Sequence, residues 1–181
     1  MNQQECMNSA STEEREPRMT MPKSARLRHR TLVNTLFEKG KNVYVYPMRG
    51  AWRVLDEEEL ATSFRRSVPE GIGPVQLMVT VPKKKRRHAV DRVRMRRLIK
   101  EAFRKRRHRL VELAEGDEQW RTLSLALIYI ADKNLDYQTI DRKMGLLFKK
   151  LTEALADRNN KKESEGERGK HDESGEKGAE A

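Results

Sequence analysis

Cysteine is almost missing from this chain, and long apolar runs are missing altogether. The one cysteine, Cys6, can form neither an intrachain disulfide nor a cysteine-based metal site by itself. No stretch approaches the roughly 18 uninterrupted apolar residues of a membrane span, and the N-terminus has no apolar signal-peptide core. We therefore expect a soluble, cytoplasmic protein without a membrane partner.

Both ends of the chain lack the large apolar side chains that a folded core requires. Residues 1–22 contain no Val, Leu, Ile or aromatic residue, and residues 157–181 contain no large apolar residue. Such segments cannot bury enough surface to offset the entropy lost on ordering. We therefore predict a disordered N-terminal tail over 1–22, one modest domain over 23–156, and a disordered, charged C-terminal tail over 157–181.

Acidic residues are scarce in one internal segment. Residues 83–109 contain fifteen Lys and Arg but only two acids, Asp91 and Glu101, whereas the whole chain has a formal net charge of +11. The basicity is therefore one local feature. A concentrated positive surface displaces counterions from a phosphate backbone, which is the main source of affinity for nucleic acid. The alternatives are a nuclear-localisation-type run and a merely solvated charge run.

The same segment has the period of an amphipathic helix. At about 100° per residue, one arc gathers Leu98, Ala102, Met95, Ile99 and Phe103. The other side carries Arg94, Arg96, Arg97, Lys100 and Arg104. Arg92 projects within the apolar arc, one turn earlier, at the helix start. One face is suited to pack against a sheet or helix and the other to meet phosphates, which favours nucleic-acid binding.

The remaining pattern predicts a single α+β domain. In chain order we expect a helix that ends before Gly40, strands over 43–46 and 48–55, a loop over 56–74, a strand over 75–81, the basic helix over 89–113, a strand over 123–131, and a helix capped by Asp136. The order α-β-β-β-α-β-α indicates a small sheet packed by helices, with a β-α-β crossover.

The most specific pattern runs from Val81 to Phe103: Val-Pro-Lys-Lys-Lys-Arg-Arg-His-Ala-Val-Asp-Arg-Val-Arg-Met-Arg-Arg-Leu-Ile-Lys-Glu-Ala-Phe. It resembles the signature of the protein subunit of bacterial ribonuclease P, in which a paired lysine after a strand leads to an Arg-Asn-Arg helix start. The resemblance extends from about Lys23 to Leu155. Val93 stands where the family has its central Asn, and His88 stands where it has the Asn before Ala-Val, so a polar contact made by Asn at position 93 is not available to this chain.

The resemblance implies a ribosomal-protein-S5-domain-2-like fold whose β-α-β crossover is left-handed, although most such crossovers are right-handed. It also implies an RNA-binding subunit of an endoribonuclease, which binds a large catalytic RNA and assists endonucleolytic removal of the 5′ leader from precursor tRNA. The chemistry would belong to the RNA and its bound Mg²⁺, and the protein alone would bind no cofactor. The implied partners are the ribonuclease P RNA subunit and precursor tRNA, and no DNA.

Two groups of residues are candidate contacts. We expect RNA binding by the basic segment, through Lys83, Lys84, Lys85, Arg86, Arg87, His88, Arg92, Arg94, Arg96, Arg97, Lys100 and Arg104. Phe37, Tyr44 and Tyr46 are candidates to stack on single-stranded bases, and the resemblance implies that such a sheet face binds the leader. Tyr44 and Tyr46 share strand parity, whereas Phe37 is equally consistent with a core position.

We find no convincing catalytic centre in the sequence. Asp56, Glu57, Glu58 and Glu59 are adjacent, so they cannot all point into one site from a regular element, and we interpret them as a solvated loop. Asp91 suits the N-terminal dipole and cap of the basic helix. The four histidines, at positions 29, 88, 108 and 171, show no zinc spacing. We therefore expect no catalytic or metal-binding residues in the protein.

Two other functions are weighed against this interpretation. A ribosomal or other structured-RNA-binding protein would share the charge and the fold class, but it would lack the pattern from Lys84 to Phe103. A basic-region DNA-binding dimer would need apolar residues about every seven positions beyond the basic segment. Leu110 is followed seven positions later by Asp117, with Gly116 between them, so the second alternative fails.

Overall fold

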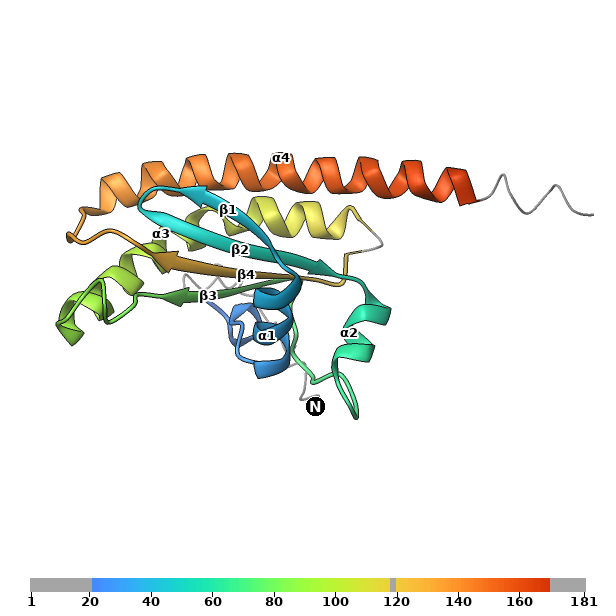
Figure 1. Ribbon diagram of the computed structural model, residues 1–181, viewed down its shortest axis with the longest axis horizontal. Helices are drawn as coiled ribbons and strands as arrows, with labels where there is room; N and C mark the ends of the chain where they lie inside the picture. The colour runs from blue at the N-terminus through green and yellow to red at the C-terminus, as the bar shows by residue number, and fades with distance from the viewer. Residues whose placement is uncertain (1–20, 118–119, 170–181) are drawn as a thin grey trace, which may run out of the picture.

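The computed structural model describes residues 21–117 and 120–169, which form one mixed α+β domain around a single sheet (Figure 1). Its elements in chain order are η1 (Lys23–Ala25), α1 (Arg30–Lys39), β1 (Lys41–Val45), β2 (Met48–Leu55), α2 (Glu57–Ser63), β3 (Val75–Thr80), α3 (Ala89–Glu115), β4 (Thr122–Tyr129) and α4 (Tyr137–Gly169). No helix within these residues is both long enough and apolar enough to span a membrane.

The sheet has four strands in the order β1-β2-β4-β3. β1 and β2 form a hairpin and β2 pairs antiparallel with β4, whereas β3 pairs parallel with β4. Parallel neighbours need a crossover connection, and α3 supplies it, so the predicted β-α-β unit is confirmed. Its left-handedness stays a prediction of the family resemblance.

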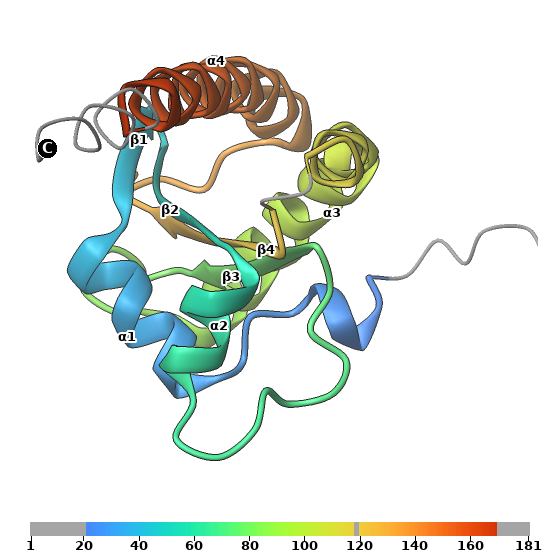
Figure 2. The same ribbon diagram turned by 90° about the vertical axis from the view of Figure 1, so that its right-hand side faces the viewer.

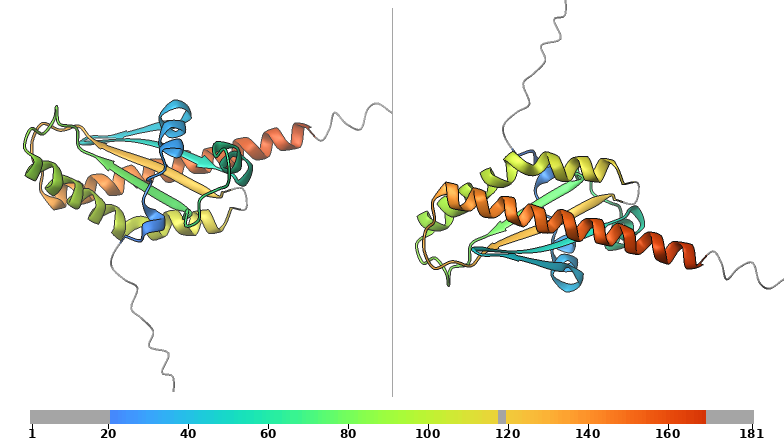
Figure 3. Two further views of the ribbon diagram at one scale, coloured as in Figure 1. Left: turned by 90° about the horizontal axis from the view of Figure 1, so that it is seen from below. Right: turned by 90° about the horizontal axis from the view of Figure 1, so that it is seen from above.

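One face of the sheet is covered by α3 and α4, which lie side by side across it (Figures 2 and 3). The inward residues of alternate strand positions, such as Trp52, Leu77 and Leu125, pack there against the apolar stripes of both helices. The predicted stripe of α4 is confirmed, because Ile140, Met144, Leu147, Phe148, Leu151 and Leu155 are all buried. β4 is buried on both faces, as its almost continuous apolar sequence predicts.

The opposite face carries a smaller second core. α1 crosses the strands there and buries Leu32 and Leu36 against Ala51 and Ala126 of the sheet, while α2 adds Leu60 (Figure 3). The alternation of strand side chains therefore serves two apolar layers, one beneath α3 and α4 and one beneath α1 and α2.

Two segments differ from the sequence-based predictions. The predicted loop at Asp56–Glu59 is wrong: Asp56 accepts a hydrogen bond from the Glu59 backbone N–H at 2.8 Å and caps α2. The acids of the first turn suit the positive end of a helix. At the other end of the chain, α4 continues to Gly169, beyond residue 157, where we expected a tail. Residues 1–20 and 170–181, with Cys6 and His171, lie outside the described residues, and the predicted domain boundaries stay a prediction.

Candidate nucleic-acid interface

The basic segment begins in a loop that is fastened to the rest of the domain. β3 ends at Thr80, and the loop over 81–88 leads into α3. Lys85 pairs with the Asp132 carboxylate at 3.0 Å, and the Arg86 guanidinium donates to the Asp132 carbonyl at 2.5 Å. Lys83, Lys84 and Arg87 are exposed to solvent, as is His88. The loop after β4 thus holds the loop before α3 and leaves the other cations available.

Arg92 has a structural role at the start of α3. Its guanidinium donates to the carbonyls of Arg86 at 3.0 Å and Arg87 at 2.6 Å, which closes the basic loop onto the helix. The N-cap position is His88, without a side-chain cap, and Asp91 accepts a hydrogen bond from the Asn134 amide at 2.8 Å. The prediction that Asp91 caps the helix is therefore wrong, because the N-cap is His88 and the Asp91 carboxylate binds Asn134 instead. Asp91 does lie in the first turn of α3, where a carboxylate suits the helix dipole.

The predicted apolar face of α3 is confirmed. Met95, Ile99, Ala102 and Phe103 are fully buried, and Phe103 packs against Phe148 of α4 with ring centroids 5.5 Å apart. Leu98 is only half-buried at the edge of this core. Burial of this stripe fixes the rotation of the helix and therefore turns its basic side outward.

The basic face divides into two classes of side chain. Arg94, Arg96, Arg97 and Lys100 are exposed and make no hydrogen bond or ion pair within the described part of the chain. Arg104, in contrast, is engaged: its guanidinium donates twice to the Glu101 carboxylate, at 2.6 and 2.8 Å, and this hydrogen bonding lowers the pKa of Glu101. Four cations on α3 are thus ready to contact an anion.

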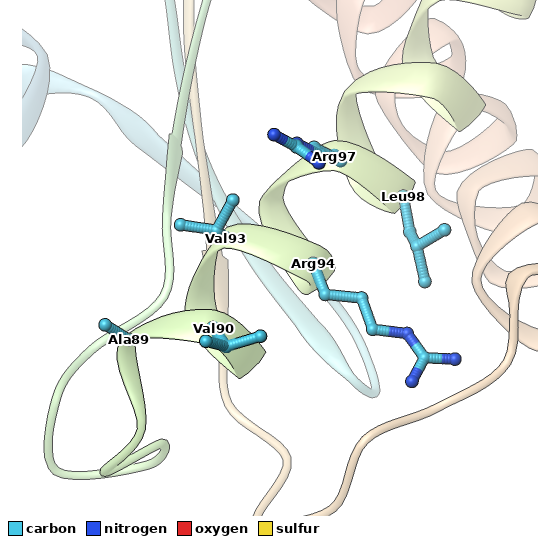
Figure 4. Close-up of a pocket in the computed structure, with 6 residues that line it drawn as sticks. All are labelled: Ala89, Val90, Val93, Arg94, Arg97 and Leu98. Carbon is cyan, nitrogen blue, oxygen red and sulfur yellow. The ribbon is translucent and has the colours of Figure 1, made fainter.

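A hollow of about 510 Å³ follows the exposed side of the first turns of α3 (Figure 4). Its lining residues are Ala89, Val90, Val93, Arg94, Arg97 and Leu98. Val90 is 79% exposed and Val93 is 36% exposed. The position that carries Asn in the resembled family is therefore an apolar surface between guanidinium groups, so contact there is restricted to packing.

One cross-strand row of the sheet is left uncovered beside α1. The strand register places Tyr44, Arg49, Ile128 and Thr80 in one row, from the β1 edge to the β3 edge, on the face that α1 crosses. Tyr44, Arg49 and Thr80 are exposed and Ile128 is half-buried, whereas the next row contributes Ala51 and Ala126 to the core under α1. The row ends at Thr80, where the basic loop begins.

The aromatic candidates are all solvent-accessible. Phe37 is 51% exposed, Tyr44 57% and Tyr46 54%, so a core position for Phe37 is excluded. Tyr46 lies in the turn with Pro47, outside β1, so strand alternation does not fix its direction as we predicted. Tyr44 remains on the strand and shares its face with Arg49.

An ion pair braces α3 against α4 behind the basic face. Arg106 donates to both carboxylate oxygens of Asp141, one of them at 2.7 Å, and Lys105 lies 5.0 Å from the centre of the Tyr137 ring. The hydrogen bonds from Arg106 hold the pKa of Asp141 below its usual value. Arg107 is partly buried on the same helix, and desolvation lowers the pKa of its guanidinium.

The acidic run and His29 make local contacts within the described residues. No three His, Cys, Asp or Glu side chains gather there as a possible metal site. Glu57 and Glu59 of the acidic run pair with Arg121 and Arg53. His29 packs edge-on against Phe64, with ring centroids 5.8 Å apart.

Sequence reasoning missed Arg49, Ile128 and Thr80 of the open row. They come from three different strands, so only the register assembles them. The one available signal was their parity relative to the buried positions of each strand.

Comparisons with known proteins agree with the residue pattern. The family model for ribonuclease P matches residues 21–152. The ribonuclease P protein components of two strains of Porphyromonas gingivalis are each 33% identical to this chain, over 128 residues (71% of this chain and 83% of the relative) and 124 residues (68% and 80%).

Solved structures of related proteins are more distant. The RNase P protein of Staphylococcus aureus is 16% identical, with a TM-score of 0.45 over 69% of this chain and 93% of that chain. The RNase P protein of Thermotoga maritima is 18% identical, with a TM-score of 0.45 over 67% of this chain and 94% of that chain. Because the family model matches most of the chain and the Porphyromonas gingivalis proteins are 33% identical over more than two thirds of it, the chain belongs to the ribonuclease P protein family.

Proposed function

We propose that this chain binds the catalytic RNA of ribonuclease P through α3 and holds the 5′ leader of precursor tRNA on the open row of its sheet. Family members are protein components of ribonuclease P, an endoribonuclease in which the RNA carries the catalysis. The observation that carries the proposal is the open row, which ends at Thr80 where the basic loop into α3 begins.

The contact with the RNA subunit rests on the exposed cations of the loop and the helix. Lys83, Lys84, Arg87, Arg94, Arg96, Arg97 and Lys100 are proposed to meet phosphates directly, with His88 beside them. Lys85, Arg86 and Arg92 hold the loop in shape through Asp132 and backbone carbonyls, and Arg104 shares its charge with Glu101. The strongest electrostatic contribution is therefore expected from the first turns of α3.

The leader contact rests on Tyr44 and its neighbours. Single-stranded RNA is commonly held by base stacking on aromatics beside a cationic groove. Tyr44 supplies the ring and Arg49 the adjacent cation, while Phe37 stands exposed on the helix that borders the row. Tyr46 follows the last residue of β1, in the turn to β2, and is proposed to extend the surface formed by Tyr44 and Arg49.

The protein's contribution to the reaction is positioning and charge. Mg²⁺ ions that take part in phosphodiester cleavage are proposed to be held by the RNA subunit, while the cations of α3 offset repulsion between the two RNAs. We also propose that the complex acts in the cytoplasm, where precursor tRNA is processed.

Replacement of Tyr44 and Tyr46 by Ala tests the leader contact. One stacked base contributes roughly 1–3 kcal/mol, so the holoenzyme affinity for precursor tRNA should fall about fivefold or more, whereas mature tRNA affinity and RNA-subunit binding should hardly change. Leu146→Ala is a matched control, because Leu146 is an exposed apolar residue on α4, in the opposite layer. Equal losses for precursor and mature tRNA would contradict a leader contact.

A further inference from the structure

We propose that the segment after α2 and the segment before α1 form a second cationic surface, which holds the 5′-distal part of the leader. The proposal rests on the proposed function, because it extends the leader path beyond the open row. The α1–α2 cationic surface consists of Lys23, Arg26, Arg28, Arg30, Arg65 and Arg66. Lys23, Arg26 and Arg28 precede α1, Arg30 is its first residue, and Arg65 and Arg66 follow α2.

The fold brings the two segments together at both ends. The Phe64 ring packs edge-on against His29, with ring centroids 5.8 Å apart, and so places Arg65 and Arg66 directly beside the start of α1. At the other end, the Gly73 N–H donates to the Ser24 carbonyl at 3.2 Å, and the buried Gln76 amide donates to the same carbonyl at 3.2 Å. Residues 64–73 are therefore attached to residues 21–30 at both of their ends.

Apolar contacts of residues 60–72 make this arrangement part of the core. Leu60 and Ile72 are buried in the cluster beneath α1, and Phe64 and Val68 pack against it. The Thr122 hydroxyl, on β4, also donates to the Gly73 carbonyl at 2.8 Å. The two arginines thus project from a segment held on both sides by buried groups, which limits the ordering entropy that binding would cost.

The charge of this surface is almost purely positive. Residues 21–30 contain no acid and residues 64–73 contain one, Glu70, whereas all six cations are exposed. None of the six forms an ion pair within the part of the chain described here. Of the acids in the first turn of α2, Glu57 pairs with Arg121 at 2.8 Å and Glu59 with Arg53 at 3.2 Å, while Glu58 is exposed, so positive charge predominates on this surface. A polyanion is the partner that such a surface fits.

The position of the surface favours the leader over the RNA subunit. Arg30 and Phe37 are seven residues apart on α1, so they share one flank of the helix. From Arg30 the cations continue through Arg28 to Arg65 around the N-terminal end of α1. The basic face of α3, in contrast, belongs to the layer on the other side of the sheet (Figure 2). A flexible single strand that leaves the open row can follow this path.

The length of the leader distinguishes contact with the open row from contact with the α1–α2 cationic surface. The full chain would be assembled with its RNA subunit, and affinity would be measured over a range of salt for precursor tRNA with a short leader, which covers only the open row, and with a long unstructured leader. Each phosphate contact with a single strand adds about 0.7 to the salt slope, or roughly fourfold in affinity between 1 M and 0.15 M salt. Arg65→Ala/Arg66→Ala should therefore weaken long-leader binding on the order of tenfold and leave short-leader binding unchanged.

Two matched variants complete the test. Arg142→Ala/Lys149→Ala removes the same charge from exposed positions on α4 and should not affect leader length dependence, and Arg65→Lys/Arg66→Lys should keep most of the long-leader affinity. An equal loss with both leaders, or a loss of RNA-subunit binding, would overturn the proposal, as would no loss at all. A wild-type holoenzyme that binds precursor and mature tRNA equally would instead refute the proposed function.

Discussion

The exposed arginines of α3 allow a quantitative prediction about salt dependence. Arg94, Arg96 and Arg97 have no partner within the described residues, so each is expected to contact one phosphate of the RNA subunit. A contact with duplex phosphate contributes about 0.9 to the slope of log affinity against log salt, or about fivefold between 1 M and 0.15 M salt. The triple Ala variant should therefore lose about 2.7 from the slope and on the order of 100-fold in affinity.

Arg104 provides the internal comparison. It has the same charge and lies on the same helix, but Glu101 already accepts two hydrogen bonds from its guanidinium. Arg104→Ala should consequently change the slope by much less than Arg96→Ala. The assay is titration of labelled RNA subunit with each variant at several salt concentrations, together with thermal unfolding to verify the fold. Unchanged slopes in the triple variant would refute the phosphate contacts, and equal slope changes for Arg96→Ala and Arg104→Ala would refute the distinction between unpaired and paired cations.

Three further predictions concern stability, each measured by urea unfolding. Hydrogen bonds from Arg106 depress the folded-state pKa of Asp141. The pair therefore stabilises the fold above the ordinary carboxyl pKa of about 3.9, and this contribution is lost as pH falls through the depressed value. Asp141→Asn should lower the free energy of unfolding by about 1–3 kcal/mol at neutral pH and by much less in acid, and a loss that does not depend on pH would contradict this prediction. Phe103→Ala should cost about 3–5 kcal/mol because the ring is fully buried, and Leu98→Ala should cost less because Leu98 is half-buried; the reverse order would mean that the rotation of α3 is wrong. Asp56→Ala should cost about 1 kcal/mol through the lost cap, and an unchanged stability would show that α2 is held by packing alone.

Local patterns were sufficient where one residue period dominates. The rotation of α3 follows from its apolar stripe, and β4 follows from an apolar run too short for a helix. α2 was missed because four consecutive acids suggest a solvated loop. Yet Asp56 precedes Glu59 by three residues, which is the spacing of a helix N-cap and its partner, and Leu60 is the residue that anchors α2 in the core. A helix of seven residues is stable only through such packing, which a local pattern does not reveal.

Only the part of the candidate site whose residues lie close together in the sequence could be predicted. The exposed cations of α3 lie within the short segment 94–100, so their common surface was visible from the helical period. The role of Arg92 was not, because its acceptors are the carbonyls of Arg86 and Arg87, whose direction depends on the folded loop. The open row likewise required the pairing of strands that are distant in the chain, and register between such strands is set by the whole core.

The central place of β4 determines when the domain can form during synthesis. β2 and β3 both pair with β4, so the sheet cannot close until β4, with Tyr129 opposite Met48, has been synthesised. The ribosome therefore releases α3 while its apolar stripe has no completed sheet to cover it. Long-range pairing of this kind slows folding and leaves apolar surface exposed to aggregation. The cations that we propose to contact RNA lie on the other side of the nascent helix, and like charges repel, so we expect them to oppose association between such chains until β4 has been synthesised.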